Sequence, residues 1–327
     1  MRRFRAAPAA TLAVLAVLGC GVQPAPRFRG VPRAAYGPPR PPGPLPGFGH
    51  VFVLVEENAN FADVIGDTSM PYLNGLAQQY ALATEFYGNV HPSIGNYFMM
   101  IVGDTITNDD GFSELVTRDN LVRVLTTAGK TWKSYAEDLP AVGYRGPGRG
   151  RYARKHNIFA LLSDVAHDSA QARNLVPFTQ LATDVAGNTL PDYAFIIPNL
   201  CNDAHDCPLK TADAWLREHI DPLVRSDVFQ RENDLLIIVF DESRVDDTAG
   251  GGRIPCVIVS PKVKPGYRST TFYQQQSLLR LSLRALGVTT YPGAAANAPD
   301  MDEFFEVPVA PRAHRASAGG SSRSNQN

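Results

Sequence analysis

Residues 51–58 read VFVLVEEN, a continuous apolar run that ends in two carboxylates and an amide. Short runs of this kind, rich in β-branched residues, are typical of strands buried on both faces of a parallel sheet. Similar runs follow at 193–197, 235–240 and 254–259. Helix-like stretches lie between the runs, at 70–80, 120–128, 211–224 and 274–286. This alternation predicts a three-layer α/β/α sandwich with a largely parallel central sheet.

Polar side chains stand where three of these runs end. Glu57 and Asn58 follow the first run, and Asp241 and Glu242 follow the run at 235–240. The run at 193–197 leads into PNLCND. Any one of these groups could be a helix cap or a turn residue. Because loops converge at the carboxyl ends of parallel strands, the three together predict one polar site at that edge of the sheet.

Residues 91–97, HPSIGNY, supply a hydroxyl that the strand ends lack. Ser93 stands at the start of an expected helix, where free N–H groups and the helix dipole favour a bound phosphate. The same serine could be an ordinary N-cap. A serine nucleophile needs a base or a metal, and no Gly-x-Ser-x-Gly turn surrounds Ser93. Activation by a metal at the strand-end carboxylates is therefore the favoured route.

Four segments in this order resemble the bacterial phosphoesterase family: VEENANF at 55–61, HPSIGNY at 91–97, CNDAHDC at 201–207 and FDE at 240–242. That family contains secreted acid phosphatases and phosphatidylcholine-type phospholipases C, and it is similar in fold and chemistry to alkaline phosphatases. Within it, the chain most resembles the mycobacterial type of secreted acid phosphatase, which is associated with hydrolysis of phosphatidylinositol 3-phosphate.

The resemblance implies a divalent metal site made by four residues: Glu57, Asn58, Asp241 and Glu242. The metal would be calcium, magnesium or zinc. Hard oxygen ligands suit calcium or magnesium, whereas zinc usually takes more nitrogen or sulfur, and the identity stays open.

The resemblance also implies how phosphate is handled. Ser93 would be the nucleophile and would form a phosphoseryl intermediate that water hydrolyses. Asn96 would donate a hydrogen bond to a phosphate oxygen. His205, with His156 and Lys155, would stabilise the phosphoryl group or protonate the leaving oxygen. Phosphoryl transfer depends above all on positioning and charge neutralisation, which such groups supply.

Two positions depart from the family pattern. Gly95 stands where a proline commonly precedes the asparagine, and Gln275 stands where a histidine is common. A missing histidine would change an outer contact of the metal site, and with it the pH dependence or the metal affinity.

The two ends of the chain indicate its compartment. Residues 1–20 combine an arginine-rich start with an apolar stretch, as in a secretory signal, and end in a lipobox-like VLGC, which makes Cys20 a candidate for lipidation. Conventional cleavage nearby is the alternative. Residues 21–47 are proline-rich and predict a tether, residues 48–309 predict the phosphoesterase domain, and residues 310–327 predict a disordered tail.

The other cysteines fit an oxidising compartment. Cys201 and Cys207 are close enough to close one loop by a disulfide. A zinc site with His205 is the alternative, but the cysteine spacing is unlike that of the usual zinc fingers. Cys256 lies in an apolar run and is expected to be a buried free thiol.

These features predict an exported, metal-dependent phosphomonoesterase with an acidic pH optimum, acting on a phosphorylated small molecule or a phospholipid headgroup. The alternatives are a phospholipase C-type phosphodiesterase and a non-catalytic lipoprotein that binds phosphate or metal. A formal net charge of -1 gives no electrostatic case for a nucleic-acid partner. Contact with a membrane is expected only through the N-terminal lipid anchor.

Overall fold

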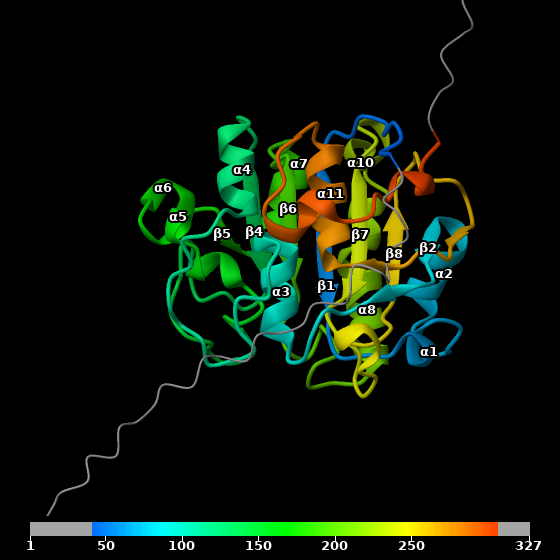
Figure 1. Ribbon diagram of the computed structural model, residues 1–327, viewed down its shortest axis with the longest axis horizontal. Helices are drawn as coiled ribbons and strands as arrows, with labels where there is room; N and C mark the ends of the chain where they lie inside the picture. The colour runs from blue at the N-terminus through cyan, green and yellow to red at the C-terminus, as the bar shows by residue number, and fades with distance from the viewer. Residues whose placement is uncertain (1–40, 307–327) are drawn as a thin grey trace, which may run out of the picture. The chain divides into compact units, whose positions relative to one another are not determined.

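The computed structural model describes residues 41–306, and a central eight-stranded sheet organises them (Figure 1). The order across the sheet is β5 (Leu175–Pro177), β4 (Trp132–Ala136), β6 (Tyr193–Ile197), β1 (Val51–Glu56), β7 (Leu235–Phe240), β8 (Cys256–Val259), β2 (Ala81–Ala83) and β9 (Tyr267–Ser269). A small second sheet pairs β3 (Phe86–Tyr87) with β10 (Tyr273–Gln274).

Most of the sheet is parallel, as predicted. β1 lies in its middle, and Leu54 faces Ile196 on one neighbour and Ile238 on the other, both in parallel register. β8 is the exception, because it runs antiparallel to both β7 and β2. It begins only after Pro255, whose missing N–H cannot join the ladder. The carboxyl ends of β1, β6 and β7 therefore meet at one edge.

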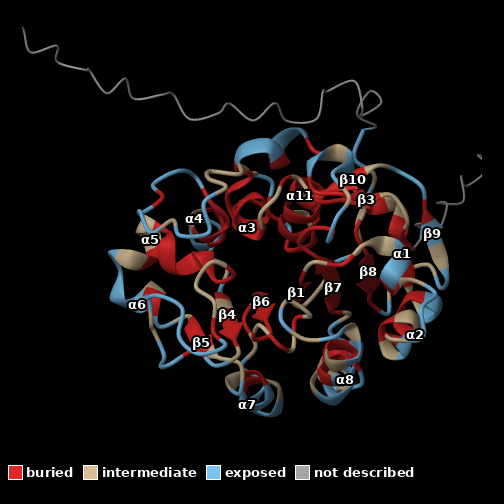
Figure 2. Cartoon of the chain, turned by 90° about the horizontal axis from the view of Figure 1, so that it is seen from below, coloured by how far each residue is buried: buried red, intermediate tan, exposed pale blue. Residues whose placement is uncertain are grey.

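Helices cover both faces of the sheet (Figure 2). One face carries α3 (Ser93–Val102), α4 (Leu121–Thr127) and α11 (Gln275–Ala285), and the other carries α7 (Gln180–Gly187) and α8 (Leu209–His219). α2 (Pro71–Gln79) packs against α8 and β8. Shorter helices occupy the connections: α1 (Phe61–Val64), α5 (Ser163–Ala166), α6 (Ser169–Ala172), α9 (Asp221–Val224) and α10 (Asp227–Arg231), with 3-10 turns at Ile158–Leu161, Thr248–Gly250, Gly293–Asn297 and Asp302–Phe304. The α/β/α sandwich is confirmed.

The sequence prediction named only part of the elements, and two of the differences have a clear physical reason. The single helix expected at 211–224 is two helices, because Pro222 cannot continue α8 and instead stands in the first turn of α9. β4 was not predicted, since its sequence WKSYA interrupts the apolar pattern with Lys133 and Ser134. Both polar groups have partners: Lys133 pairs with Asp184, and Ser134 donates to Asn157.

The predicted signal segment with Cys20, most of the tether and the tail at 310–327 lie outside the described residues. The end of the tether is attached to the domain, because Leu45 packs on the core and Gly43 O accepts a hydrogen bond from Arg284. Within residues 41–306, no helix combines the length and the apolarity needed to cross a bilayer.

Candidate active site

The hydroxyl of Ser93 lies between two carboxylates. Ser93 is the first residue of α3, and its side chain is buried. Its Oγ lies 3.0 Å from Glu57 Oε2 and 3.2 Å from Glu242 Oε1. Glu57 directly follows β1 and Glu242 stands just beyond β7, so the pairing of these strands brings both to one edge. The serine thus lies at the strand-end site.

Asn58 and Asp241 complete this group of polar side chains. Asn58 N donates to Asp241 Oδ1 at 3.1 Å, and Asn58 Nδ2 donates to Glu57 Oε2 at 3.1 Å. The φ angle of Asn58 is 54°, in the left-handed region that asparagine tolerates better than most residues. Asp241 N in turn donates to Glu56 O at 2.9 Å, which extends the strand pairing into the site. We call Asn58, Ser93, Asp241 and Glu242 the oxygen side of Glu57.

The oxygen side holds more negative charge than its surroundings neutralise. Burial raises the pKa of Glu57 well above its usual range, and Asp241 and Asp203 raise it further. Burial likewise raises the pKa of Asp241 to about 8, with a further contribution from Glu242. Buried carboxylates repel one another unless they bind protons or a cation. A set of carboxylate and amide oxygens is the donor set of a hard divalent cation, so the residues fit such an ion.

A second group of side chains faces the other oxygen of Glu57. Tyr97 OH donates to Glu57 Oε1 at 2.6 Å, and its ring stacks on His156 at 4.9 Å. His156 Nε2 lies 3.3 Å from the same Oε1, and its Nδ1 lies 3.4 Å from Asp203 Oδ2. Burial, followed by the charge of Lys155, lowers the pKa of His156 well below its usual value, so its imidazole is neutral.

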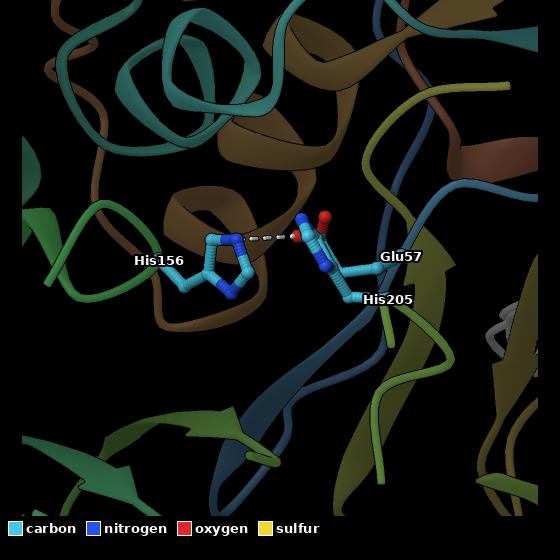
Figure 3. Close-up of side chains that lie close together, drawn as sticks. All are labelled: Glu57, His156 and His205. Carbon is cyan, nitrogen blue, oxygen red and sulfur yellow. Dashed lines mark ion pairs between the residues drawn. The ribbon is translucent and has the colours of Figure 1, made fainter. Parts of the chain in front are cut away.

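His205 stands beside Glu57 and His156 (Figure 3). Its ring centre lies 5.7 Å from that of His156. Ligand atoms of Glu57, His156 and His205 lie within 4.8 Å of one another, close enough to hold a metal ion. We call Tyr97, His156, Asp203 and His205 the histidine side of Glu57. Imidazole nitrogens and a carboxylate form a softer donor set than the oxygen side.

The loop that carries His205 is closed by the predicted disulfide between Cys201 and Cys207. Within the loop, Asp203 Oδ1 accepts from His205 N at 2.8 Å, and Asp203 O accepts from Glu57 N at 2.7 Å. The disulfide reading is therefore confirmed over the zinc alternative. Cys256 is a buried free thiol, also as predicted.

Lys155 lies at the outer edge of the histidine side. Its Nζ lies 2.6 Å from Asp110 Oδ2 and 3.5 Å from His205 Nε2. The sequence did not single out Asp110, which lies 45 positions from its partner in a loop without a motif. Lys155 is thus paired, yet it remains close enough to the site that its charge lowers the pKa of Glu57.

Asn96 bonds to the backbone of the segment before Ser93. Its Oδ1 accepts from Asn89 N at 2.8 Å and from Val90 N at 3.2 Å, and its Nδ2 donates to Val90 O at 2.8 Å. The side chain is fully buried. In this structure Asn96 folds the segment that precedes Ser93. Its Nδ2 carries a second hydrogen beside the one given to Val90 O, so the hydrogen bond to a phosphate oxygen stays a prediction.

The two departures from the family pattern have structural counterparts. A Cβ atom on Gly95 would lie 2.5 Å from Val90 Cγ2, so the segment packs too closely there for a larger residue. Gln275 Nε2 donates to Asp241 O at 2.6 Å, and Gln275 is fully buried. Glutamine at this position therefore supports the backbone of Asp241, an outer contact of the oxygen side.

A cavity of about 480 Å³ opens beside the site. Asn58 and His205 lie in its wall, together with Asp63, Arg244 and the disulfide loop. Its wall thus includes one residue of the oxygen side and one of the histidine side. Arg244 was not among the predicted site residues, because nothing in its local sequence distinguishes it from a solvated surface charge.

The chain is similar in sequence to proteins named as phosphatases. The chain is 34% identical over 264 residues to a phosphatidylinositol-3-phosphatase of Mycobacterium tuberculosis, an alignment that covers 80% of this chain and 84% of that protein. It is 31% identical over 248 residues to a probable acid phosphatase of Kluyveromyces lactis, covering 71% of this chain. An acid phosphatase of Aspergillus fumigatus is 32% identical over the same length. The chain spans little more than half of these two fungal proteins, 56% and 53%.

Solved structures share the fold. A protein of the alkaline phosphatase superfamily from Vibrio parahaemolyticus matches with a TM-score of 0.53 and 12% identity, covering 80% of this chain and 72% of that one. The lipoteichoic acid synthase LtaP from Listeria monocytogenes matches with the same score and identity, covering 77% of each chain. The model of the phosphoesterase family matches residues 67–288. The chain belongs to the phosphoesterase family, and it is a hydrolase of phosphoric esters.

Proposed function

We propose that the protein is an exported, metal-dependent phosphomonoesterase of the acid phosphatase type that uses Ser93 as its nucleophile. The observation that carries this proposal is the position of Ser93 Oγ at the first turn of α3, between the carboxylates of Glu57 and Glu242. Such a hydroxyl has a proton acceptor within hydrogen-bonding distance, and the helix N-terminus favours the phosphate that it attacks.

A divalent cation fits the oxygen side. Glu57, Asn58, Asp241 and Glu242 would hold it, and their buried charge supports this assignment. When bound, the ion supplies charge neutralisation for the phosphate and lowers the pKa of the serine hydroxyl. The triad of Glu57, His156 and His205 is a second place where a cation would find ligands. Calcium, magnesium and zinc are all candidates, and the two donor sets differ in which of these they favour.

The protein groups perform a two-step phosphoryl transfer. In the first step, Ser93 Oγ forms a bond to phosphorus, the bond from phosphorus to the ester oxygen breaks, and the serine proton passes to a neighbouring carboxylate. His205 donates a proton to the departing oxygen. In the second step, a water oxygen forms a bond to phosphorus and gives one proton back to His205; the bond from phosphorus to Ser93 Oγ breaks, the carboxylate returns its proton to Oγ, and free phosphate leaves. Positioning and charge neutralisation supply most of the acceleration in such transfers.

The charged rim of the site suits a phosphate group. Lys155 reaches His205 at 3.5 Å and would place its positive charge near the phosphoryl oxygens. His156 is neutral and buried, so it would orient Glu57 and the phosphate instead of supplying charge. The cavity of about 480 Å³ would take the alcohol part of the substrate. A phosphorylated small molecule or a phospholipid headgroup would fit this arrangement.

The relatives support a phosphomonoester substrate. The protein of Mycobacterium tuberculosis is named a phosphatidylinositol-3-phosphatase, and the fungal proteins are named acid phosphatases. We therefore propose phosphatidylinositol 3-phosphate as a lipid substrate to assay first. The disulfide supports export, because disulfides persist in oxidising compartments. Lipidation at Cys20 would anchor the protein at the bacterial cell envelope; without it, the protein would be secreted or periplasmic.

The test is phosphate release from an aryl phosphate and from phosphatidylinositol 3-phosphate, with and without a chelator. We expect Ser93→Ala to lower kcat by at least about a thousandfold. Ser282→Ala is the matched control, because Ser282 is also a buried helical serine and its hydroxyl has no hydrogen-bond partner among the described residues. Turnover by Ser93→Ala, or activity that a chelator leaves unchanged, would overturn the mechanism.

A further inference from the structure

His91 contacts the active site in a way that its place in the sequence does not reveal. The residue stands two positions before Ser93, and its side chain is 31% exposed. Its Nδ1 lies 2.6 Å from Glu242 Oε2. Its Nε2 lies 3.2 Å from Asp246 O and 3.4 Å from Asp247 Oδ1. The imidazole therefore bridges the carboxylate of Glu242 and the loop that follows it.

Glu242 divides its two oxygens between two partners. Oε2 faces His91 at 2.6 Å, and Oε1 faces Ser93 Oγ at 3.2 Å. A carboxylate held at one oxygen cannot rotate freely about its last torsion, so the contact with His91 fixes where Oε1 lies. The hydroxyl proton of the nucleophile therefore meets an acceptor whose orientation His91 sets.

The loop after Glu242 is itself well anchored. Asp246 N donates to Ser243 Oγ at 3.0 Å, and Ser243 N donates to Gly251 O at 2.8 Å. A Cβ atom on Gly252, where φ is +74°, would lie 2.1 Å from Asp246 O. The loop therefore has little room to move away from the imidazole, and Asp246 O is a fixed acceptor for Nε2.

The imidazole is not needed to hold its own backbone segment. Asn96 ties down Asn89 and Val90, and Asn108 Nδ2 donates to His91 O at 2.6 Å. Gln274 Nε2 donates to Gly88 O at 3.0 Å. These amides fix the chain before Ser93 without the ring. The remaining contact of the ring that reaches the reacting group is the one to Glu242.

We propose that His91 is a positioning residue that orients Glu242 toward the hydroxyl of Ser93. The inference rests on the proposed role of Ser93 as the nucleophile. The ring of His91 contacts Glu242 and the loop that follows it, so His91 acts on the hydroxyl through the carboxylate. Partners that orient such carboxylates typically change activity by about ten- to a hundredfold when they are removed.

The first test compares two substitutions of His91. His91→Leu removes the donor to Glu242, and we expect kcat to fall by about ten- to a hundredfold, whereas KM stays within about threefold. His91→Asn keeps an N–H donor near the position of Nδ1 and is expected to recover most of kcat. His50→Leu is the matched control: His50 also pairs with a buried carboxylate, Asp234 at 3.0 Å, but at the opposite end of β1. It should leave kcat unchanged.

The second test asks whether His91 acts through Glu242. Glu242→Gln and the double variant His91→Leu/Glu242→Gln are measured in the same assay. If the inference holds, the double variant is no slower than Glu242→Gln alone, because the effect of His91 is already lost. Fully additive losses would overturn it, as would wild-type kcat in His91→Leu. If His91→Leu does not fold, His91→Gln and His91→Asn are compared instead. The amide of His91→Gln lies near the position of Nε2, whereas the amide of His91→Asn lies near the position of Nδ1.

Ser93→Ala in the same series separates the two proposals. If Ser93→Ala is inactive and His91→Leu turns over like the wild type, the inference about His91 fails and the proposed function stands. If Ser93→Ala retains turnover, the proposed function fails, and the inference fails with it.

Discussion

The oxygen side and the histidine side of Glu57 are built in different ways. The oxygen side comes from the ends of β1 and β7 and the first turn of α3, and the strand pairing continues into it through the bond from Asp241 N to Glu56 O. The histidine side comes from loops. His156 stands between β4 and a 3-10 turn, and His205 stands in the loop that the disulfide closes.

This difference indicates how each side keeps its shape. A sheet of parallel strands fixes the oxygen side with many backbone hydrogen bonds, so its ligands have little freedom. The histidine side depends on a few specific interactions: the disulfide, the stacking of His156 on Tyr97, and the hydrogen bond that Asp203 accepts from His205 N. We therefore expect substitutions on the oxygen side to abolish phosphate release. Loss of an interaction that holds the histidine side should only reduce its rate.

Glu57→Gln should have the largest effect, because one oxygen of Glu57 faces Ser93 and the other faces Tyr97 and His156. The change removes the shared negative charge, and we expect kcat to fall by at least about a thousandfold with loss of the bound metal. Metal content of the purified protein and phosphate release measure the two outcomes.

Glu56→Gln is the matched control for that variant. Glu56 is equally buried, and burial followed by Asp203 raises its pKa well above the usual range, as burial does for Glu57. Neither of its oxygens has a hydrogen-bond partner among the described residues. A neutral amide of the same shape should therefore change kcat by less than about threefold. Equal losses in the two variants would mean that the site does not distinguish the neighbouring glutamates.

The oxygen side could be predicted from the sequence, and the contacts of the histidine side could not. An apolar strand run that leads into Glu57 or Asp241 can be recognised in the sequence. Because the carboxyl ends of parallel strands must meet, such runs predict that these side chains lie together. The bond from Tyr97 to Glu57 joins residues 40 positions apart, and it depends on how α3 packs against the sheet. Spacing alone carries no information about such a contact.

The position of Asn96 shows the same limit. Its place three residues after Ser93 puts Asn96 near the nucleophile, but the bonds of its side chain to the backbone of Asn89 and Val90 could not be read from the sequence. A motif indicates which residues are near the nucleophile, whereas the partners of each side chain are decided by the folded chain. The strand at 132–136 escaped prediction for a related reason, since its two polar residues find partners only in the folded chain.

Removing the disulfide should have a smaller effect that is confined to the histidine side. We expect Cys201→Ala/Cys207→Ala to lower kcat by about tenfold, because the loop that carries Asp203 and His205 loses its closure, and to lower stability by about 2 kcal/mol. Metal binding by the oxygen side should remain. The measurements are kcat, metal content and the melting temperature, each compared with a sample treated with reductant.

Cys256→Ala is the control for that variant, since Cys256 is a buried free thiol in β8 and is not part of the loop. It should lower the melting temperature through a small cavity and leave kcat unchanged. If the double alanine variant retains full kcat while losing stability, the loop holds His205 without the disulfide, and the contrast between the two sides is weaker than we argue.

Tyr97→Phe should have the smallest effect, because it keeps the ring that stacks on His156 and removes only the hydroxyl. Burial raises the pKa of Glu57, as do Asp241 and Asp203, whereas the hydrogen bond from Tyr97 lowers it. Loss of that bond should raise the pKa of Glu57 further, so that a higher pH is needed before the carboxylate can bind a cation. On acidification, the variant should therefore lose its metal at a higher pH than the wild type; this acidic limb should move by about one unit or less. Above the limb, the metal affinities of variant and wild type should converge. Metal titrations at a series of pH values measure the limb; a shift to lower pH would show that Tyr97 does not stabilise the charged form of Glu57.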